Sequence, residues 1–356
     1  MSNFNRGEWS EIYAILSMLL CPNLSIGNSH LEEITNKLYT LKKIILYPLT
    51  DLMEYELKNN GDVNVYLNNE FNSVIKQTEL FENKKKIYDA IKNAPIGNGA
   101  FEIDDINHFL FKINNNSYIK SKSTNKEDIE AIIYDARFGT NKSLKYSIKS
   151  SLGNPATILN SSQKTNFLYE ITGLDEKYID EINSIKTRTK LIDRLKKIIN
   201  YGGKIKFVKV CSETFDYNLK MIDSNMPNYL GNALLESYFG EKDLVTCFLK
   251  GNKFDDVNFA LKKLADFLEG ISFGFVPGKK WDGMNLVNGG LVIIKSDGSI
   301  AVLDLVYFKS EVRKYILNES KFDSPSVLRY GMLNLHKIPF DDKIYFTLNL
   351  QLRYKK

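Results

Sequence analysis

One stretch of the chain places acidic, hydroxyl and basic side chains at spacings that could support metal-dependent chemistry. An apolar run is bounded by Asp128 and Asp135, and a polar turn separates it from a segment of alternating polar and apolar residues. Two β-rich runs around a turn that contains Gly and Asn predict a β-hairpin. Alternation along the second strand places Lys145, Ser147 and Lys149 on one face. A lysine and a carboxylate brought together across this hairpin could hold a divalent metal and a phosphodiester.

The register of the hairpin decides which aspartate lies near Lys149. A turn centred on residues 138–141 would set Lys149 opposite a position two residues from Asp128. A turn centred on residues 140–143 would set it beside Asp135 instead. A slip of one residue moves every side chain to the other face of the strand. From the residues alone, both aspartates remain candidates.

These residues resemble the D…(D/E)xK core of nucleases, with Ser147-Ile148-Lys149 in place of (D/E)xK. The wider sequence resembles the HpaII-type restriction endonucleases in four segments. They are SIKSSLGNPATILNSSQKTNFLYEI from residue 147, GEWSE at 7–11, WDG and GGLVIIK within 281–295, and KFDSPSVLR at 321–329 before a terminal LNLQLRY. The resemblance implies a Mg²⁺-dependent endonuclease that cuts double-stranded DNA at a short palindrome, of the CCGG type. It also implies a homodimer on that palindrome and a DNA methyltransferase with the same target as a partner.

The resemblance assigns roles to the residues of the hairpin. Lys149 would orient the nucleophile and offset developing charge, although SxK alone is more typical of an ordinary surface lysine. The usual position of the first metal-binding aspartate in this core favours Asp128, with Asp135 as the alternative. Ser147 is the departure from the motif, because a hydroxyl is a poor metal ligand. Glu11, in a predicted N-terminal helix, is the candidate for the missing carboxylate, although the helix dipole alone could favour an acid there.

Several polar residues outside the hairpin are candidates for DNA contacts, since hydroxyl, amide and basic groups serve both phosphate and base-edge contacts. The alternative interpretation is a solvated loop with helix caps, in which Trp281 anchors the GKKWDG segment. The DNA-contact candidates are Asn160, Ser161, Lys164, Thr165, Asn166, Lys279, Lys280, Ser324, Ser326 and Arg329.

The composition is that of a globular protein with ample core: 356 residues, 43% hydrophobic and 26% charged. The net charge of +5 excludes a polycationic tail, so DNA binding would need a local basic surface. Three widely spaced cysteines and three histidines in no cluster argue against zinc and a disulfide framework, and favour a cytoplasmic location. We find no segment typical of a membrane span or an export signal.

The predicted fold class is mixed α/β, a PD-(D/E)xK-like core whose central mixed sheet has helices on both faces. Residues 1–200 would form the nuclease core with its catalytic hairpin at 128–150, and residues 201–356 an α+β part that extends the DNA-binding cleft. Periodicity predicts a helix at 7–21, strands at 41–47, 62–68, 165–171 and 204–210, and a hairpin within 291–308. It also predicts a long helix at 69–93, a further strand at 215–222 and a single terminal strand at 343–354.

Two other functions fit the same residues. A repair or structure-specific nuclease on the same core would cut according to DNA shape. A DNA-binding protein without catalytic activity would explain Ser147 in place of a carboxylate.

Overall fold

A computed structural model describes residues 3–47, 51–94, 99–114, 126–338, 341 and 343–355. The chain forms two units. Unit 1 comprises Met1–Ala156 and Asn285–Tyr315, and unit 2 comprises Thr157–Met284 and Ile316–Lys355. None of these boundaries falls at residue 200, because residues 201–203 form a turn between two elements of unit 2.

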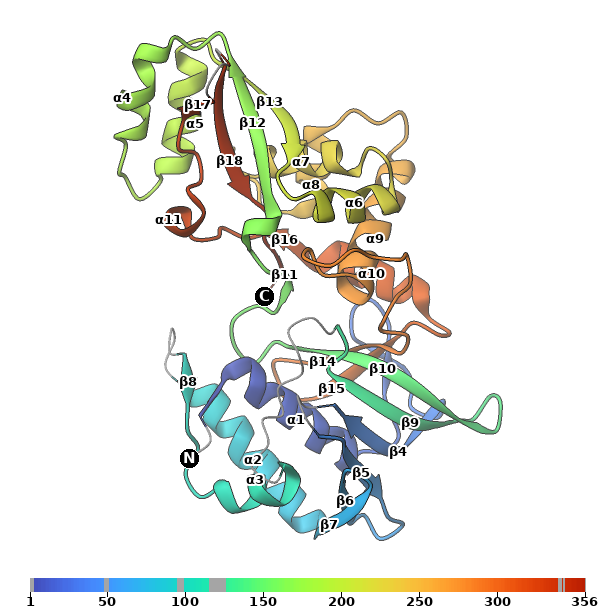
Figure 1. The fold of residues 1–356 in the computed structure, drawn as a ribbon. Helices are drawn as coiled ribbons and strands as arrows, with labels where there is room; N and C mark the ends of the chain where they lie inside the picture. Colours follow the sequence, from blue (N-terminus) through green and yellow to red (C-terminus); the bar gives the residue numbers. More distant parts are fainter. Residues whose placement is uncertain are drawn as a thin grey trace. The chain divides into compact units, whose positions relative to one another are not determined.

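Unit 1 is built on a ten-stranded mixed sheet in the order β3-β2-β15-β14-β10-β9-β4-β5-β6-β7 (Figure 1). Its strands are β2 (Ile26–Gly27), β3 (Glu33–Thr35), β4 (Tyr39–Leu46), β5 (Met53–Leu57), β6 (Val63–Leu67), β7 (Glu70–Ile75), β9 (Ile129–Asp135), β10 (Thr140–Ser150), β14 (Gly290–Ile294) and β15 (Ile300–Asp304). The remaining elements are the β1 (Phe4–Asn5) and β8 (Ala100–Phe101) pair, α1 (Arg6–Leu20), α2 (Gln77–Asn93), α3 (Asn107–Asn114) and the start of α10 (Lys309–Glu319). Unit 1 is therefore a mixed α+β structure in which helices flank a large mixed sheet.

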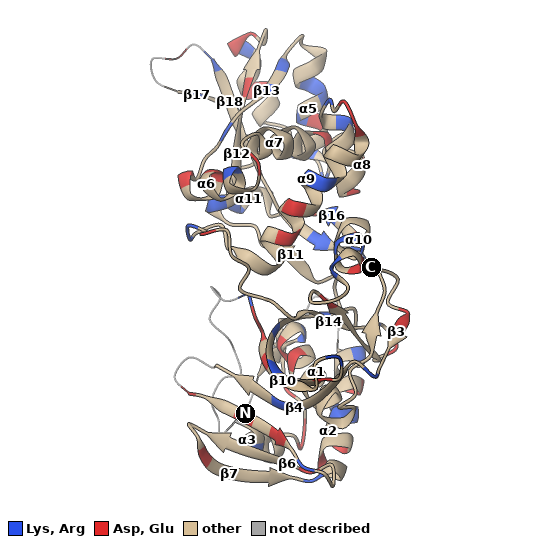
Figure 2. Ribbon diagram, turned by 90° about the vertical axis from the view of Figure 1, so that its right-hand side faces the viewer, with Lys and Arg blue, Asp and Glu red and all other residues tan. Residues whose placement is uncertain are grey.

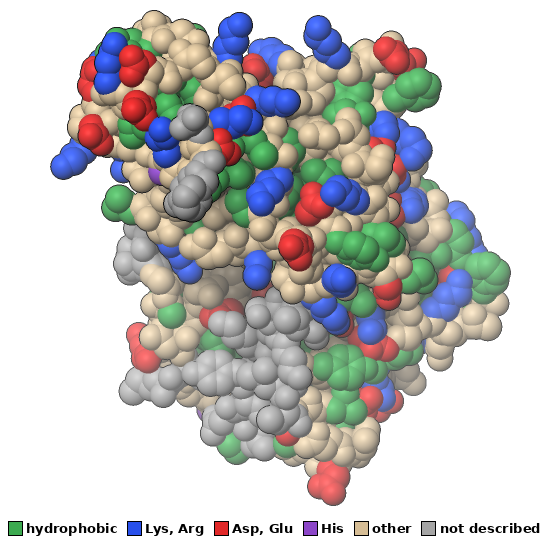
Figure 3. Space-filling model, turned by 45° about the horizontal axis from the view of Figure 1, so that its top comes forward, with side chains coloured by type: hydrophobic (Ala, Val, Ile, Leu, Met, Phe, Trp, Pro, Cys, Tyr) green, Lys and Arg blue, Asp and Glu red, His purple; other side chains and the backbone are tan. Residues whose placement is uncertain are grey.

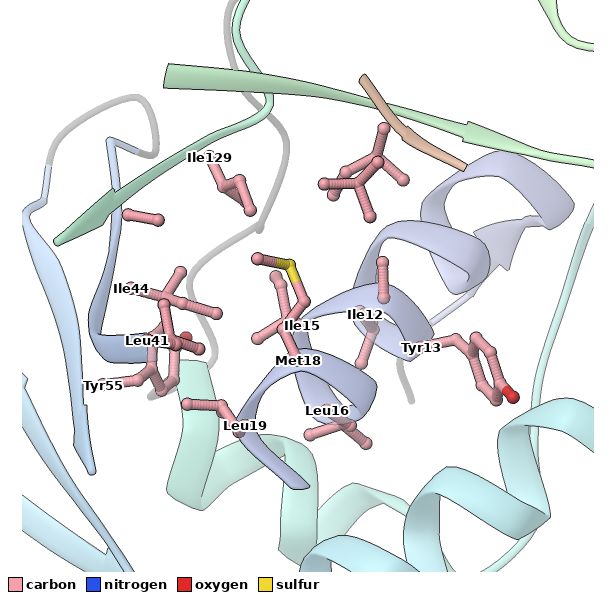
Figure 4. Packing of buried hydrophobic residues seen from close by; sticks show 14 of the residues in the cluster. Ile12, Tyr13, Ile15, Leu16, Met18, Leu19, Leu41, Ile44, Tyr55 and Ile129 are labelled. Atoms are coloured by element: carbon pink, nitrogen blue, oxygen red, sulfur yellow. The ribbon is translucent and has the colours of Figure 1, made fainter. Parts of the chain in front are cut away.

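Helix α1 packs on the centre of this sheet. It begins at a capping box, in which the Asn5 side chain accepts from the Glu8 amide and the Glu8 carboxylate accepts from the Asn5 amide. Its apolar residues surround almost the whole helix and are buried, as their distribution predicts. Figure 4 shows Ile15 and Met18 directed toward Ile129 of β9.

The β9–β10 hairpin spans the residues expected from the sequence, with its turn earlier along the chain than expected. Thr140 pairs with Asp135 at the turn, and Tyr146 pairs with Ile129 at the other end of the ladder. The second half of β10 also pairs in parallel with β14. On its other side β14 pairs closely with β15, and Gly290 permits this, because its φ of 122° is unfavourable for other residues and a Cβ there would meet the Leu303 carbonyl of β15. The expected hairpin within residues 291–308 is confirmed as β14 and β15.

The long helix predicted at residues 69–93 is wrong in its first turns. Asn68 and Asn69 have positive φ angles of 52° and 69° and form a tight turn that joins β6 to β7. Such left-handed Asn pairs suit two-residue hairpin turns. Helix α2 begins only at Gln77, and β5 is an additional strand that was not expected.

Unit 2 contains a four-stranded antiparallel sheet in the order β13-β12-β18-β17, with α6, α7 and α8 grouped beside β13 (Figure 1). The sheet comprises β12 (Asn166–Thr172), β13 (Lys204–Val210), β17 (His336–Lys337) and β18 (Ile344–Asn349). The helices are η1 (Gln163–Thr165), η2 (Glu176–Tyr178), α4 (Ile179–Asn183), α5 (Lys190–Asn200), α6 (Glu213–Ile222), α7 (Met226–Glu236), α8 (Leu244–Gly251), α9 (Val257–Glu269), η3 (Gly270–Gly274) and α11 (Val327–Tyr330). A small sheet, β11-β19-β16, joins Thr157–Leu159, Leu352–Tyr354 and Ser320–Phe322.

Two further sequence predictions in unit 2 are corrected. The segment expected as a strand at 215–222 is part of α6, because the Ser212 side chain caps the helix by accepting from the Phe215 amide. Phe215 and Leu219, four residues apart, form its buried stripe. The expected single terminal strand is divided into β18 and β19 at Leu350 and Gln351.

Charged residues of both signs occur in both units (Figure 2). On the face drawn in Figure 3, Lys and Arg side chains are interspersed with acidic and hydrophobic ones. On this face, any basic surface for DNA must therefore be local. No helix within the described residues is long and apolar enough to cross a membrane.

Candidate active site

Asp128, Ser147 and Lys149 form a hydrogen-bonded cluster at the open end of the β9–β10 hairpin. Asp128 Oδ2 accepts from the Ser147 hydroxyl at 3.0 Å and from the Ile148 amide at 2.6 Å. Lys149 Nζ donates to Ser147 Oγ at 2.7 Å and lies 3.9 Å from Asp128 Oδ2. The Asp128 and Lys149 side chains are 19% and 22% exposed, so solvent and a substrate can reach both groups.

The register that produces this cluster lies earlier than either register considered from the sequence. Lys145 pairs with Glu130 and Tyr146 with Ile129, and the amide of the next residue, Asp128, donates to the Tyr146 carbonyl at 2.9 Å. Both expected turns were placed too late along the chain. The observed register nevertheless brings Lys149 beside Asp128, the aspartate preferred on the resemblance.

Asp135 lies at the opposite end of β9, in a different environment. The strand of seven residues separates it from Asp128 by about 23 Å. Its fully buried carboxylate forms an ion pair with Lys142 Nζ at 2.8 Å and accepts from the Tyr307 hydroxyl at 2.6 Å. Burial alone would raise the pKa of Asp135, but the hydrogen bonds from Lys142 and Tyr307 outweigh it and the pKa is lowered. These contacts are those of a buried structural ion pair.

A second lysine, Lys126, belongs to the electrostatic environment of the cluster. Burial, followed by the charge of Lys149, lowers the pKa of Lys126 to about 8, and Asp128 acts in the opposite direction. Lys126 precedes the hairpin ladder, which ends at the Ile129–Tyr146 pair. Sequence reasoning missed this residue.

The structure does not bring the three proposed metal ligands together. Glu11 lies half-buried on α1, and α1 packs against β10. Within the described residues, no group of three or more Asp, Glu, His or Cys side chains could hold a metal ion. Asp128 is the carboxylate beside Lys149, and its Oδ1 accepts no hydrogen bond from the described part of the chain.

In unit 2, Asn349 organises the polar segment that contains Asn160 to Asn166. Its buried amide donates to the Ser162 carbonyl at 2.7 Å and to Asn166 Oδ1 at 2.6 Å, and Thr165 Oγ1 donates to Asn349 Oδ1 at 3.3 Å. Thr165 is fully buried, so its hydroxyl supports the turn from within. Asn160 and Lys164 are exposed and remain candidates for DNA contacts.

The same segment is joined to α11. The Tyr330 hydroxyl donates to the Ser161 carbonyl at 3.0 Å. Ser326 caps α11 by accepting from the Arg329 amide, which accounts for this serine structurally. Arg329 and Ser324 are exposed. The Ser324–Arg329 candidates therefore lie next to the Asn160–Asn166 candidates, although more than 150 residues separate them along the chain.

Lys279 and Lys280 are exposed on a loop that buried Asn218 positions. Asn218 donates to the Lys279 carbonyl at 2.8 Å and accepts from the Trp281 amide at 2.9 Å. The Trp281 indole donates to the Met284 carbonyl and packs on Phe275, with 5.1 Å between ring centroids. Trp281 therefore anchors the loop, while the two lysines extend into solvent.

A carboxylate–lysine pair in one unit and a polar, lysine-bearing surface in the other are features of a phosphodiesterase that acts on nucleic acid. The chain belongs to the HpaII restriction endonuclease family, whose profile matches residues 5–354. It is 32% identical to the type II restriction enzyme HpaII of Haemophilus parainfluenzae, over 98% of each chain. No solved structure matches it. The protein is therefore a restriction endonuclease, an enzyme that cuts DNA at specific sites.

Proposed function

We propose that this restriction endonuclease hydrolyses double-stranded DNA in a Mg²⁺-dependent reaction, on a PD-(D/E)xK-like core with its catalytic centre at Asp128, Ser147 and Lys149. The observation that carries the proposal is the contact between these three side chains, with Lys149 Nζ 2.7 Å from Ser147 Oγ and 3.9 Å from Asp128 Oδ2. A buried or distant lysine would not fit this role, but Lys149 is partly exposed.

Each residue of the cluster has a distinct task. The Lys149 ammonium stabilises the negative charge that develops on the phosphate in the transition state. A charged group that is already held in position lowers the activation barrier most when it lies where this charge forms. Ser147 accepts from Lys149 and donates to Asp128, so it fixes the distance between cation and carboxylate. The Ile148 amide holds one Asp128 oxygen in place and leaves the other free for a cation.

The donors of the cluster fit a magnesium ion shared with the substrate. Mg²⁺ in nucleic-acid enzymes usually takes one or two carboxylates, several waters and phosphate oxygens. Asp128 supplies one carboxylate with a free Oδ1. A bound Mg²⁺ would polarise the phosphoryl oxygen and lower the pKa of the attacking water. Glu11 stays the candidate for a second carboxylate, reached when DNA is bound.

Recognition is assigned to unit 2. Asn160, Ser161, Lys164 and Asn166 offer amide, hydroxyl and ammonium groups, and Arg329 extends the same surface. Lys279 and Lys280 can contact phosphates from their anchored loop.

The similarity to HpaII supports a CCGG-type palindrome, and a palindrome is most simply read by a two-fold homodimer. A DNA methyltransferase with the same target would protect host DNA.

Digestion of plasmid DNA with Mg²⁺, followed by sequencing of the ends, tests this function. We expect discrete fragments whose ends share one short palindrome, and no fragments in excess EDTA. Smeared products or dependence on flaps would identify a structure-specific nuclease instead. Specific binding without any cleavage, in Mg²⁺ or Mn²⁺, would identify a DNA-binding protein that has lost activity.

A further inference from the structure

Strand β13 displays three lysines on one face of the unit 2 sheet. Its ladder with β12 pairs Lys204 with Thr172, Lys206 with Glu170 and Lys209 with Leu168. The register shifts between Lys206 and Lys209, where Val208 forms a bulge. In a regular strand, two residues three positions apart, such as Lys206 and Lys209, point to opposite faces of the sheet. The bulge therefore keeps all three ammonium groups on the same side of the sheet.

The opposite face of β13 packs against the hydrophobic core of unit 2. Phe207 is buried against the backbone of Gly231 in α7, so closely that a Cβ there would clash with the ring. The Tyr169 hydroxyl, from the neighbouring strand, donates to the Gly231 carbonyl at 2.7 Å. Helices α6 and α7 thus cover one face, and the lysine face is left outward.

The three lysines carry uncompensated charge. All three are exposed. Glu170, the acidic side chain opposite Lys206, already pairs with Lys343 at 2.9 Å. None of Lys204, Lys206 and Lys209 forms an ion pair with any residue that the structure describes. An edge strand with exposed lysines also resists pairing with other strands, and that role alone could retain them.

The lysine face continues the candidate DNA-contact segment. The Cys211 amide, just after β13, donates to the Asn166 carbonyl at 2.8 Å, and Phe167 pairs with Val210. From Lys209 to Lys204 the strand covers about 17 Å. One strand of duplex DNA advances about 3.4 Å per phosphate, so this length corresponds to several consecutive phosphates.

We propose that Lys204, Lys206 and Lys209 form a phosphate-contact stripe that holds duplex DNA beside the Asn160–Asn166 segment. This inference rests on the proposed DNA-cleaving function and adds a binding surface to it. Lysine contacts to phosphates position the duplex and carry no sequence information. The stripe therefore increases affinity for cognate and unrelated DNA equally, and leaves the choice of sequence to other residues.

The test is a triple variant, Lys204→Gln, Lys206→Gln and Lys209→Gln, in the full chain. The matched control, Lys250→Gln, Lys253→Gln and Lys262→Gln, removes the same charge from exposed positions in and between α8 and α9. Binding is measured in Ca²⁺ over a range of salt concentrations, with one duplex that carries the site read from plasmid ends and one that lacks it. Circular dichroism checks that both variants are folded, and Lys→Arg at the three β13 positions should restore binding.

We expect the β13 variant to bind both duplexes about 10- to 100-fold more weakly at moderate salt. Its slope of log affinity against log salt should be shallower by about 0.9 for each lost contact. The control should bind as the wild type does. A β13 variant with wild-type affinity and slope overturns the stripe while the wild type still cuts, and equal losses in both variants attribute the effect to net charge alone. A wild-type protein that neither binds nor cuts DNA overturns the proposed function and the stripe together.

Discussion

Ser147 stands where the D…(D/E)xK arrangement has a carboxylate, and its hydroxyl contacts both other members of the cluster. It is 2% exposed, donates to Asp128 and accepts from Lys149. A hydroxyl in this position would add no negative charge for a bound metal, but it can fix the lysine relative to the aspartate. We therefore propose that the contribution of Ser147 to catalysis is positional.

We predict that Ser147→Ala lowers the single-turnover rate of cleavage by about fivefold, since one lost hydrogen bond corresponds to roughly 1 kcal/mol. The affinity for DNA should change little. Rapid-quench cleavage assays measure the rate, and Ser143→Ala, at an exposed position of the same strand, is the control. A loss as large as that of Asp128→Ala would mean that the hydroxyl itself binds the metal.

Asp135 is predicted to stabilise the fold and not to catalyse. Asp135→Ala leaves Lys142 and Tyr307 without their buried acceptor and should lower the free energy of unfolding by about 2–3 kcal/mol. In the folded protein the pKa of Asp135 is below its ordinary value. The stability that the Asp135 carboxylate contributes is therefore fully present above the pKa of the unfolded state, and is lost as pH falls through the pKa of the folded state. Urea unfolding at pH 7 and at pH 3 measures both effects. A stable Asp135→Ala protein that fails to cut would contradict this prediction and indicate a catalytic role for Asp135.

The sequence predicted the hairpin and the proximity of Lys149 to Asp128, but not the surroundings of each residue. Asp128 and Lys149 were predicted because strand alternation and the surrounding motif constrain them. Thr165 and Asp135 have suitable side chains for binding or catalysis, yet both are fully buried. Burial depends on packing partners such as Asn349 and Tyr307, which lie more than 150 residues away, and local patterns do not contain that information.

At the scale of elements, the turn at 162–166 depends on a strand from the far end of the chain. Asn349 of β18 supplies the hydrogen bonds that hold this turn. Asn349→Leu should lower the free energy of unfolding by about 1–3 kcal/mol, because the Ser162 carbonyl and Thr165 hydroxyl lose their partner.

The same Asn349→Leu change should weaken DNA binding without slowing cleavage of bound DNA. Asn252→Leu is the matched control, because that side chain donates to the Tyr229 and Phe248 carbonyls in the same unit, away from the turn. It should lower stability alone. If both variants bind DNA as tightly as the wild type, the turn does not position DNA contacts.

Local patterns predicted elements well where one type of periodicity continues, as in α1 and β10. They failed where a short turn changes the type of element. The positive-φ pair Asn68 and Asn69 ends a strand and begins another inside a segment with helical composition. Ser212 begins a helix where the alternation of β13 suggested a further strand. A single capping or turn residue decides each case, and neighbouring propensities do not reveal it.

At the scale of the whole molecule, the metal should separate binding from cutting. Mg²⁺ or Mn²⁺ should support cleavage, and Ca²⁺ should support binding with little cleavage, because calcium holds oxygen ligands in a looser geometry. Filter binding and plasmid cleavage in each metal measure the two steps. Zinc should not be needed. Cleavage that persists in excess EDTA would contradict the proposal that the reaction depends on a metal.

The most direct test of the catalytic centre compares two lysines of β10. Lys149 contacts Ser147 and lies close to Asp128, whereas Lys145, four residues earlier on the same strand, pairs with Glu130 in the ladder. The single-turnover rate of cleavage and the affinity for the same duplex are measured for Lys149→Ala and Lys145→Ala, with folding checked by circular dichroism. We predict that Lys149→Ala cuts at least about 100-fold more slowly with binding retained, while Lys145→Ala cuts at nearly the wild-type rate. A folded Lys149→Ala protein that cuts as fast as the wild type would contradict the assignment of this hairpin as the active site.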